Sequence, residues 1–130
     1  STCITELQAG SYALMDTHYV KLNLPFVQSC FVLGTVISKS RGWLVIDVGL
    51  KSLGMDHGNP TVEGYEVLFC SDEHTTLVPK KESTDLEISV GHKLRVVPAH
   101  IDPTMAMHEL AYLVRDEQII DAWPIDLRGW

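Results

Sequence analysis

Residues 29–48 read SCFVLGTVISKSRGWLVIDV and carry a clear strand signal. From Ser29 to Ser38 most residues are β-branched or apolar, which favours an extended strand. In such a strand, residues 31, 33, 35 and 37 point to one face and residues 32, 34 and 36 to the other. The polar turn at 39–42 ends in Gly42, and a second apolar run extends from Trp43 to Val48. Two strand-forming runs around a short glycine-containing turn predict a β-hairpin.

Similar strand-length runs recur along the rest of the chain. We expect strands over 11–18, 65–70, 75–78 and 93–98, and a second hairpin from 110–115 and 118–126 across Asp116-Glu117. No stretch keeps a helical period over three turns, so helical structure is expected only as single turns near 49–53 and 104–108. We expect loops over 55–61 and 80–85, and helical or irregular structure over 86–90. Many short strands separated by turn residues indicate an all-β fold, a small sandwich or barrel.

The composition limits the classes of function. A length of 130 residues suits one domain with its own core. The net charge of −7 argues against nucleic acid or an anionic membrane as the main partner. No apolar run approaches the roughly 18 residues of a membrane span, and we expect no secretory signal. Cys3, Cys30 and Cys70 are odd in number and far apart, so we expect reduced thiols and a cytoplasmic location.

The segment 98–104, PAHIDPT, places an imidazole and a carboxylate two residues apart. It continues the expected strand, and in an extended backbone His100 and Asp102 would point to the same face. A nitrogen and an oxygen aimed at one point can bind a divalent cation and leave other coordination positions open. The pattern is short and common, so a surface histidine and aspartate in a proline-rich turn is the alternative interpretation.

Two further pairs combine a carboxylate with an imidazole and are weaker candidates for catalysis or for the wall of a site. Glu73 and His74 follow the expected strand 65–70, and Asp56 and His57 lie in the expected loop 55–61. Both pairs also fit ordinary turns, which are rich in short polar residues. The sequence therefore does not choose between a site and a solvated loop at either place.

Histidines elsewhere and the familiar catalytic motifs add little. His108 is a candidate partner for the second ring nitrogen of His100. His18, near Asp16 and Tyr19, is either functional or part of an ordinary cluster at a strand end, and the second interpretation is favoured. The sequence contains no Gly-x-Ser-x-Gly elbow, no glycine-rich phosphate loop and no Cys-x-x-Cys pair. None of the lysines has a context that suggests a buried amine for a Schiff base. From the residues alone, the chain offers a metal-binding pair without a complete catalytic constellation.

Several motifs together resemble the C-terminal domain of the D-threonine aldolase, 3-hydroxy-D-aspartate aldolase and D-serine dehydratase-like family, pyridoxal-phosphate enzymes of fold type III. These motifs are GSY at 10–12 with MD at 15–16, VIDVGLK at 45–51, DHG at 56–58, SDEH at 71–74, GHKLRVVPAHIDPT at 91–104 and WPIDLRGW at 123–130. The resemblance covers nearly the whole chain. It implies a small β-barrel of the alanine-racemase C-terminal type, appended to a larger α/β barrel.

The resemblance also implies a function. The α/β barrel, absent from this chain, would carry pyridoxal phosphate and its lysine, and residues 1–130 would form the single β-barrel domain beside it. His100 and Asp102 would bind a divalent metal. Manganese, magnesium or cobalt is expected rather than zinc, because a carboxylate stands where the zinc-dependent members have cysteine. The whole enzyme would cleave a D-3-hydroxy amino acid to glycine and an aldehyde, and this chain alone would be inactive.

Other interpretations remain open at this point. A D-serine dehydratase-like lyase and a non-catalytic barrel that binds a metal or a protein would use the same fold. A small metalloenzyme with His100, Asp102 and His74 as ligands is a weaker third. For the aldolase we expect a homodimer, the α/β barrel of the same protein as partner and a small D-3-hydroxy amino acid as substrate, with no nucleic acid and no membrane.

Overall fold

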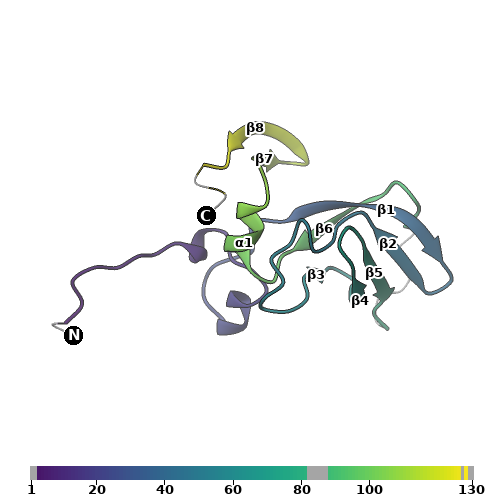
Figure 1. The fold of residues 1–130 in the computed structure, drawn as a ribbon, viewed down its shortest axis with the longest axis horizontal. Helices are drawn as coiled ribbons and strands as arrows, with labels where there is room; N and C mark the ends of the chain where they lie inside the picture. The colour runs from purple at the N-terminus through teal and green to yellow at the C-terminus, as the bar shows by residue number, and fades with distance from the viewer. Residues whose placement is uncertain (1–2, 82–87, 127, 129–130) are drawn as a thin grey trace.

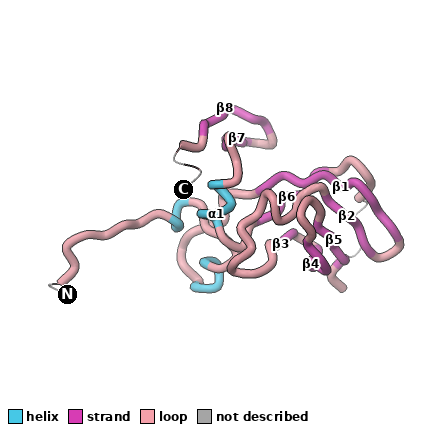
Figure 2. The backbone as a smooth tube through the Cα atoms, in the orientation of Figure 1, coloured by secondary structure: helices cyan, strands magenta, loops and turns pink. Residues whose placement is uncertain are grey.

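The computed structural model describes residues 3–81, 88–126 and 128, and it consists mostly of strands and loops (Figures 1 and 2). Two 3-10 helices, η1 (Ser11–Ala13) and η2 (Tyr19–Leu22), precede the first strand. The helix α1 (Ile101–Ala106) lies between β6 and β7. The strands are β1 (Val32–Ser40), β2 (Trp43–Ile46), β3 (Thr61–Val62), β4 (Tyr65–Cys70), β5 (Thr75–Pro79), β6 (Lys93–Val97), β7 (Leu110–Arg115) and β8 (Gln118–Pro124). Among these described helices, none reaches the length and apolarity that crossing a bilayer needs.

Six of the strands close into an antiparallel barrel in the order β1-β2-β5-β4-β3-β6, which confirms the all-β barrel prediction. The hairpin expected within residues 29–48 is present as β1 and β2, with Val36 opposite Ile46 and Ser40 opposite Trp43. The short strand β3, which no pattern predicted, closes the barrel by pairing with β4 on one side and β6 on the other. Register shifts in β1 and β4 bend these strands, and such bends help a small barrel to close.

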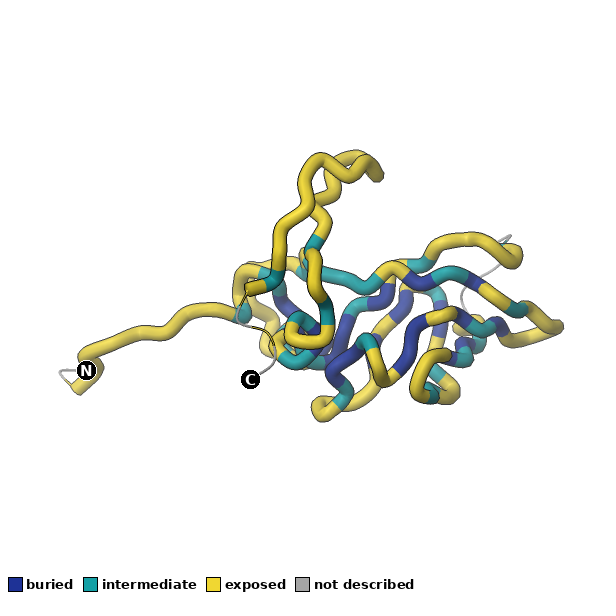
Figure 3. Tube along the Cα trace, turned by 45° about the horizontal axis from the view of Figure 1, so that its top comes forward, coloured by how far each residue is buried: buried dark blue, intermediate teal, exposed yellow. Residues whose placement is uncertain are grey.

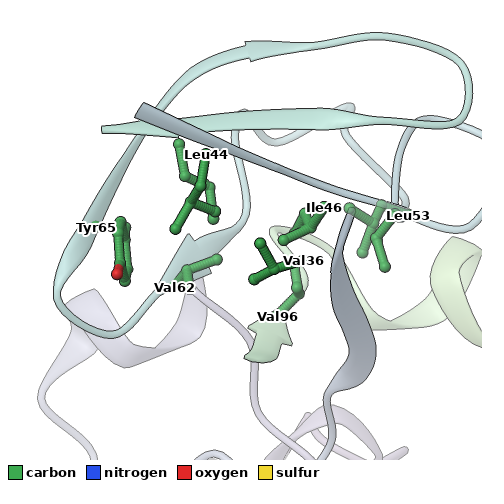
Figure 4. Close-up of a cluster of buried hydrophobic side chains, with 9 residues drawn as sticks. Val36, Leu44, Ile46, Leu53, Val62, Tyr65 and Val96 are labelled. Atoms are coloured by element: carbon green, nitrogen blue, oxygen red, sulfur yellow. The ribbon is translucent and has the colours of Figure 1, made fainter. Parts of the chain in front are cut away.

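Every barrel strand contributes to one apolar core (Figures 3 and 4). Its buried members are Val36, Leu44, Ile46, Val48, Leu53, Val62, Tyr65, Leu77 and Val96. The alternation predicted for β1 is present, because Val36 is fully buried and Leu33 is exposed. Since side chains fill the interior of so small a barrel, polar chemistry is left to its rim and loops.

The segment 11–18 is not the strand that its loose alternation predicted. It contains η1 and a turn in which Met15 has a left-handed backbone with a φ of 56°. Turn chemistry explains the difference. The Asp16 carboxylate accepts the backbone N–H groups of His18 and Tyr19 and so stabilises a tight turn in place of a strand.

Two other expected segments fall partly outside what is described. The expected loop 80–85 and the segment 86–90 include residues 82–87, which lie outside the described residues. Residues 88–90 are not helical, so the irregular alternative holds for that part of the segment.

Beyond β6 the chain leaves the barrel. α1 begins at Ile101, earlier than the helical turn predicted at 104–108, and Pro103 is tolerated because it lies in the first turn. β7 and β8 form the predicted hairpin, which stands apart from the barrel and is almost entirely exposed (Figures 1 and 3). Asp116 and Glu117 have left-handed backbones, with φ of 49° and 62°, as a primed two-residue turn requires.

Candidate metal centre

The candidate metal ligands lie where β6 runs into α1. His100 has an extended backbone and caps α1, whose first turn contains Asp102. A β-bridge between His100 and Gly54 brings the loop 55–58 against this corner. The Thr104 hydroxyl reinforces the bridge, because it accepts the N–H of Gly54 at 2.9 Å and donates to the His100 carbonyl at 2.7 Å.

This close approach requires a glycine at position 54. A Cβ there would lie 2.4 Å from Cγ of Pro103 and 3.0 Å from the carbonyl oxygen of His100. Forcing a methyl group into so tight a contact would push the two segments apart. The absence of a side chain at Gly54 is therefore what allows the loop 55–58 to reach His100.

The imidazole of His100 lies between two carboxylates. Its Nδ1 is 2.7 Å from Oδ2 of Asp56, and its Nε2 is 3.5 Å from Oδ2 of Asp102. The hydrogen bond to His100 holds the pKa of the Asp56 carboxyl below its usual range. If Asp56 accepts the Nδ1 proton, the Nε2 lone pair of His100 is left facing Asp102. His100 and Asp102 then present one nitrogen and one oxygen to the same space.

Asp102 reaches this place by a different route from the one predicted. The sequence pattern was interpreted as an extended backbone, in which residues two apart share a face. His100 is extended, with φ −140° and ψ 118°, but Asp102 belongs to the first turn of α1. The two side chains still meet because side chains in a helix lean toward its N-terminus, here toward His100. The extended geometry predicted for the pair was wrong.

Stacked imidazoles adjoin His100. The His57 ring lies over the His100 ring, with 3.9 Å between centroids and 11° between planes. The His18 ring is in turn 4.6 Å from that of His57. Asp56, His57 and His100 each offer one ligand atom, and these atoms lie within 4.8 Å of one another. A cation shared by these three residues is therefore a second possible arrangement.

The donors of this cluster suit a divalent cation. They are imidazole nitrogens and carboxylate oxygens, with no thiolate among them. The side chain of Asp102 is 71% exposed and that of His100 is 22% exposed. A cation held there would keep coordination positions open toward water or a substrate, which is the feature that separates a catalytic from a structural metal site.

Glu73 and His74 do not join this cluster. Within the described residues, neither belongs to the group that could share a cation with His100. Glu73 instead pairs with Lys51 at 2.7 Å, and this exposed ion pair lowers the pKa of Glu73 and raises that of Lys51. The turn that carries them packs against Gly49, where an added Cβ would lie 2.6 Å from the backbone nitrogen of His74.

Two further histidines also differ from expectation. His108 does not bond to His100 but to the carbonyl oxygen of Ser52, at 2.9 Å from its Nε2. His18, interpreted as part of an ordinary strand-end cluster, reaches the stacked imidazoles. The local signal for the turn that places it was present, because Asp16 is two residues before His18 and aspartate often accepts the N–H two residues on.

Comparison with known proteins gives this geometry a context. Residues 29–114 match the family described as putative serine dehydratase domain. Over 97% of its length the chain is 40% identical to a D-threonine aldolase from Arthrobacter sp., and over 95% it is 36% identical to a 3-hydroxy-D-aspartate aldolase from Paracoccus denitrificans. The alignments cover 35% and 34% of those proteins, so the chain spans about a third of the length of the curated relatives it matches.

Solved structures agree with the fold. The D-threonine aldolase from Filomicrobium marinum superposes with a TM-score of 0.82 at 35% identity, over 92% of this chain and 35% of that one. An alanine racemase-like protein from Idiomarina loihiensis gives a TM-score of 0.76 at 26% identity, over 99% of this chain and 40% of that one.

The fold and the site define a small antiparallel β-barrel of the alanine-racemase-like type with an imidazole–carboxylate cluster at its rim. The chain belongs to the putative serine dehydratase domain family, and its similarity to D-threonine and 3-hydroxy-D-aspartate aldolases confirms the resemblance found in its motifs.

Proposed function

We propose that this chain is the metal-binding C-terminal domain of an aldolase that depends on pyridoxal phosphate and a divalent metal. The whole enzyme would cleave a D-3-hydroxy amino acid, of the D-threonine or 3-hydroxy-D-aspartate type, to glycine and an aldehyde. One observation carries the proposal. The His100 imidazole lies between Asp56 and Asp102 in a chain 40% identical to a D-threonine aldolase over nearly its whole length.

In this proposal Nε2 of His100 and the carboxylate of Asp102 are the protein ligands of the metal. Asp56 accepts the Nδ1 proton at 2.7 Å and so fixes the tautomer and the direction of the ring. His57 packs flat on His100 and limits rotation of that ring. Nitrogen and oxygen donors without thiolate favour manganese, magnesium or cobalt over zinc. When bound, such a metal supplies Lewis acidity to a substrate hydroxyl and eases removal of its proton.

Pyridoxal phosphate would be bound outside this chain. No lysine of the sequence has the context of a Schiff-base amine, and Lys51 is engaged by Glu73. We therefore assign the cofactor to an α/β-barrel domain of the same protein, with residues 1–130 as the single β-barrel domain beside it. The one-third coverage of the curated relatives supports this assignment. When bound, pyridoxal phosphate supplies an electron sink for the carbanion that cleavage leaves.

Three further properties belong to the same proposal. The chain on its own would not turn over substrate, because the cofactor domain is needed for the chemistry. The parent enzyme would be a cytoplasmic homodimer. Its partners would be its own α/β barrel and a small amino acid. Nucleic acid and anionic membrane are not proposed as partners, because a protein with a net charge of −7 is repelled by polyanions.

A D-serine dehydratase-like lyase is the second candidate, and the description of the matching family favours it. The two reactions differ in the bond that breaks. An aldolase breaks the Cα–Cβ bond and gives glycine, whereas a dehydratase removes the β-hydroxyl as water and gives a keto acid and ammonia. The aldolase is preferred because of the carboxylate at Asp102 and the identities of 40% and 36% to aldolases.

The metal assignment is tested by titrating the ¹⁵N-labelled chain with Mn²⁺ and recording paramagnetic broadening of its amide signals. We expect broadening centred on residues 99–104 that is lost in His100→Ala and kept in the matched control His74→Ala. Broadening that persists in His100→Ala would contradict the assignment. Broadening centred on the 71–74 turn would mean that the metal binds there and not at His100.

The reaction is tested on the full-length parent protein with D-threonine, a substrate on which both candidates give distinct products. The aldolase forms glycine and acetaldehyde, and the dehydratase forms 2-oxobutanoate and ammonia. We expect glycine, with a loss of activity in His100→Ala that exceeds the loss in His74→Ala. Formation of 2-oxobutanoate without glycine would establish the dehydratase instead.

A further inference from the structure

A buried carboxylate, that of Asp16, lies on the segment between η1 and η2 and is hydrogen-bonded to the backbone of the metal centre. Asp16 is fully buried, and its carboxylate accepts three backbone N–H groups. Oδ1 accepts from His18 at 2.9 Å and from Tyr19 at 2.8 Å, and Oδ2 accepts from Ile101 at 3.1 Å. Burying a carboxylate is costly unless it is hydrogen-bonded, and these three bonds satisfy it.

The third of these donors lies between the two proposed metal ligands. Ile101 separates His100 from Asp102, its side chain is buried, and its N–H is held by Asp16. A second bond joins the same two segments, because Thr17 donates its N–H to the carbonyl of Pro98 at 3.1 Å. The segment 15–19 is thus hydrogen-bonded to Pro98 before His100 and to Ile101 after it. These two bonds restrict the backbone between the proposed ligands.

The other two donors connect Asp16 to the stacked imidazoles. The bonds to His18 and Tyr19 form the turn that carries the His18 ring, and this ring lies 4.6 Å from that of His57. His57 stacks on His100 at 3.9 Å. One carboxylate therefore holds both the backbone of the ligand pair and the outer end of the stack that rests on His100.

The backbone before Asp16 is strained, which indicates that its position is imposed by the surrounding structure. Met15 has a φ of 56°, in the left-handed region that side chains other than glycine rarely adopt, and it is 1% exposed. Such conformations persist only where the neighbouring structure over-determines them, and they gather at functional sites.

We propose that Asp16 is a positioning residue of the metal centre. By anchoring the Ile101 N–H it sets the spacing of the His100 and Asp102 donors, and through His18 it supports the stack beside them. Both carboxylate oxygens of Asp16 accept backbone N–H groups, so it would act on metal affinity through the ligands. This inference rests on the proposed metal-binding function.

The test compares Mn²⁺ affinity in three variants, measured by electron paramagnetic resonance of free Mn²⁺. Asp16→Asn has nearly the shape of the native side chain but replaces one acceptor oxygen with a donor. Thr75→Val is the matched control, because it removes a buried hydrogen bond from Thr75 to the Val48 carbonyl, at 2.6 Å, away from the Asp16 turn. His100→Ala reports on the proposed function itself.

We expect Asp16→Asn to bind Mn²⁺ about 10- to 100-fold more weakly, the range found when partners of metal ligands are removed. Thr75→Val should lose thermal stability but keep the native affinity. Native affinity in Asp16→Asn, or equal losses in Asp16→Asn and Thr75→Val, would overturn the positioning role while leaving the metal site in place. If the native chain binds no Mn²⁺, or if His100→Ala binds Mn²⁺ with the native affinity, both proposals are overturned.

A second measurement on the unmodified chain covers the case in which Asp16→Asn fails to fold. Coupling is reciprocal, so if the Asp16 bonds strengthen metal binding, bound metal strengthens the Asp16 bonds by the same factor. Saturating Mg²⁺ should therefore slow hydrogen exchange of the His18 and Tyr19 amides about tenfold or more. Unchanged exchange at both amides, with Mg²⁺ bound, would overturn the inference.

Discussion

Replacing Gly54 by alanine tests the contact on which the metal centre depends. The added Cβ would lie 2.4 Å from Cγ of Pro103, against 3.4–4 Å for an ordinary contact, so one of the two segments must move by about 1 Å. Overpacking of this kind costs about 1–3 kcal/mol. Strain on the hydrogen bond from Gly54 to Thr104 adds about 1 kcal/mol. For a domain of this size the sum lowers the Tm by on the order of 10 °C.

The displacement also separates the loop 55–58 from His100, so Gly54→Ala should weaken Mn²⁺ binding about tenfold. The assay is thermal unfolding followed by the amide signals of the barrel, with Mn²⁺ affinity measured separately. Gly10→Ala is the matched control, because nothing lies within 4 Å of a Cβ at that position. The reasoning is refuted if Gly54→Ala and Gly10→Ala unfold at the same temperature.

Three further predictions concern the barrel, a thiol and the second hairpin. Leu77→Ala should cost about 2–5 kcal/mol in urea unfolding because Leu77 is fully buried, while Leu33→Ala, at an exposed position of β1, should cost under about 0.5 kcal/mol. Burial raises the pKa of the Cys30 thiol, so less thiolate is present near pH 7 and iodoacetamide should label Cys30 more slowly than exposed Cys3, as followed by mass spectrometry. Faster labelling of Cys30 would contradict its burial. Glu117→Gly places a residue without a Cβ at a left-handed position of the β7–β8 turn and should stabilise that hairpin by up to about 1 kcal/mol. Slower amide exchange in the hairpin, with the barrel amides unchanged, would show this.

Much of the barrel could be predicted because strand patterns are local. The alternation in residues 31–37 separated the two faces of β1 without saying which is the inner one, and the run at 65–70 gave β4 with its observed bounds. The turn Asp116-Glu117 was likewise found from local composition. β3 was missed because two residues, Thr61 and Val62, are too few to show a period.

The remaining errors come from contacts between residues distant in sequence. The segment 11–18 is the exception, because the turn that replaces the predicted strand is local: Asp16 accepts the N–H groups of His18 and Tyr19, and only its third bond, from Ile101, spans 85 residues. His100 and Asp102 could be selected from a short motif, but their geometry depends on where α1 begins. Asp56 and His57 were weak candidates because their approach to His100 is created by the contact between Gly54 and Pro103.

The detached β7–β8 hairpin has a consequence for how unfolding of this chain should be interpreted. All the registered pairs of β7 are with β8, whereas the barrel strands pair among themselves. An isolated two-stranded hairpin is only marginally stable, so it can melt at a lower temperature than the barrel. Among the described residues, Trp43 lies in β2 and Trp123 in β8, so the fluorescence of these two tryptophans should combine two separate transitions. Two-state cooperativity is then a property of the barrel, and an apparent free energy fitted to the total fluorescence describes neither unit.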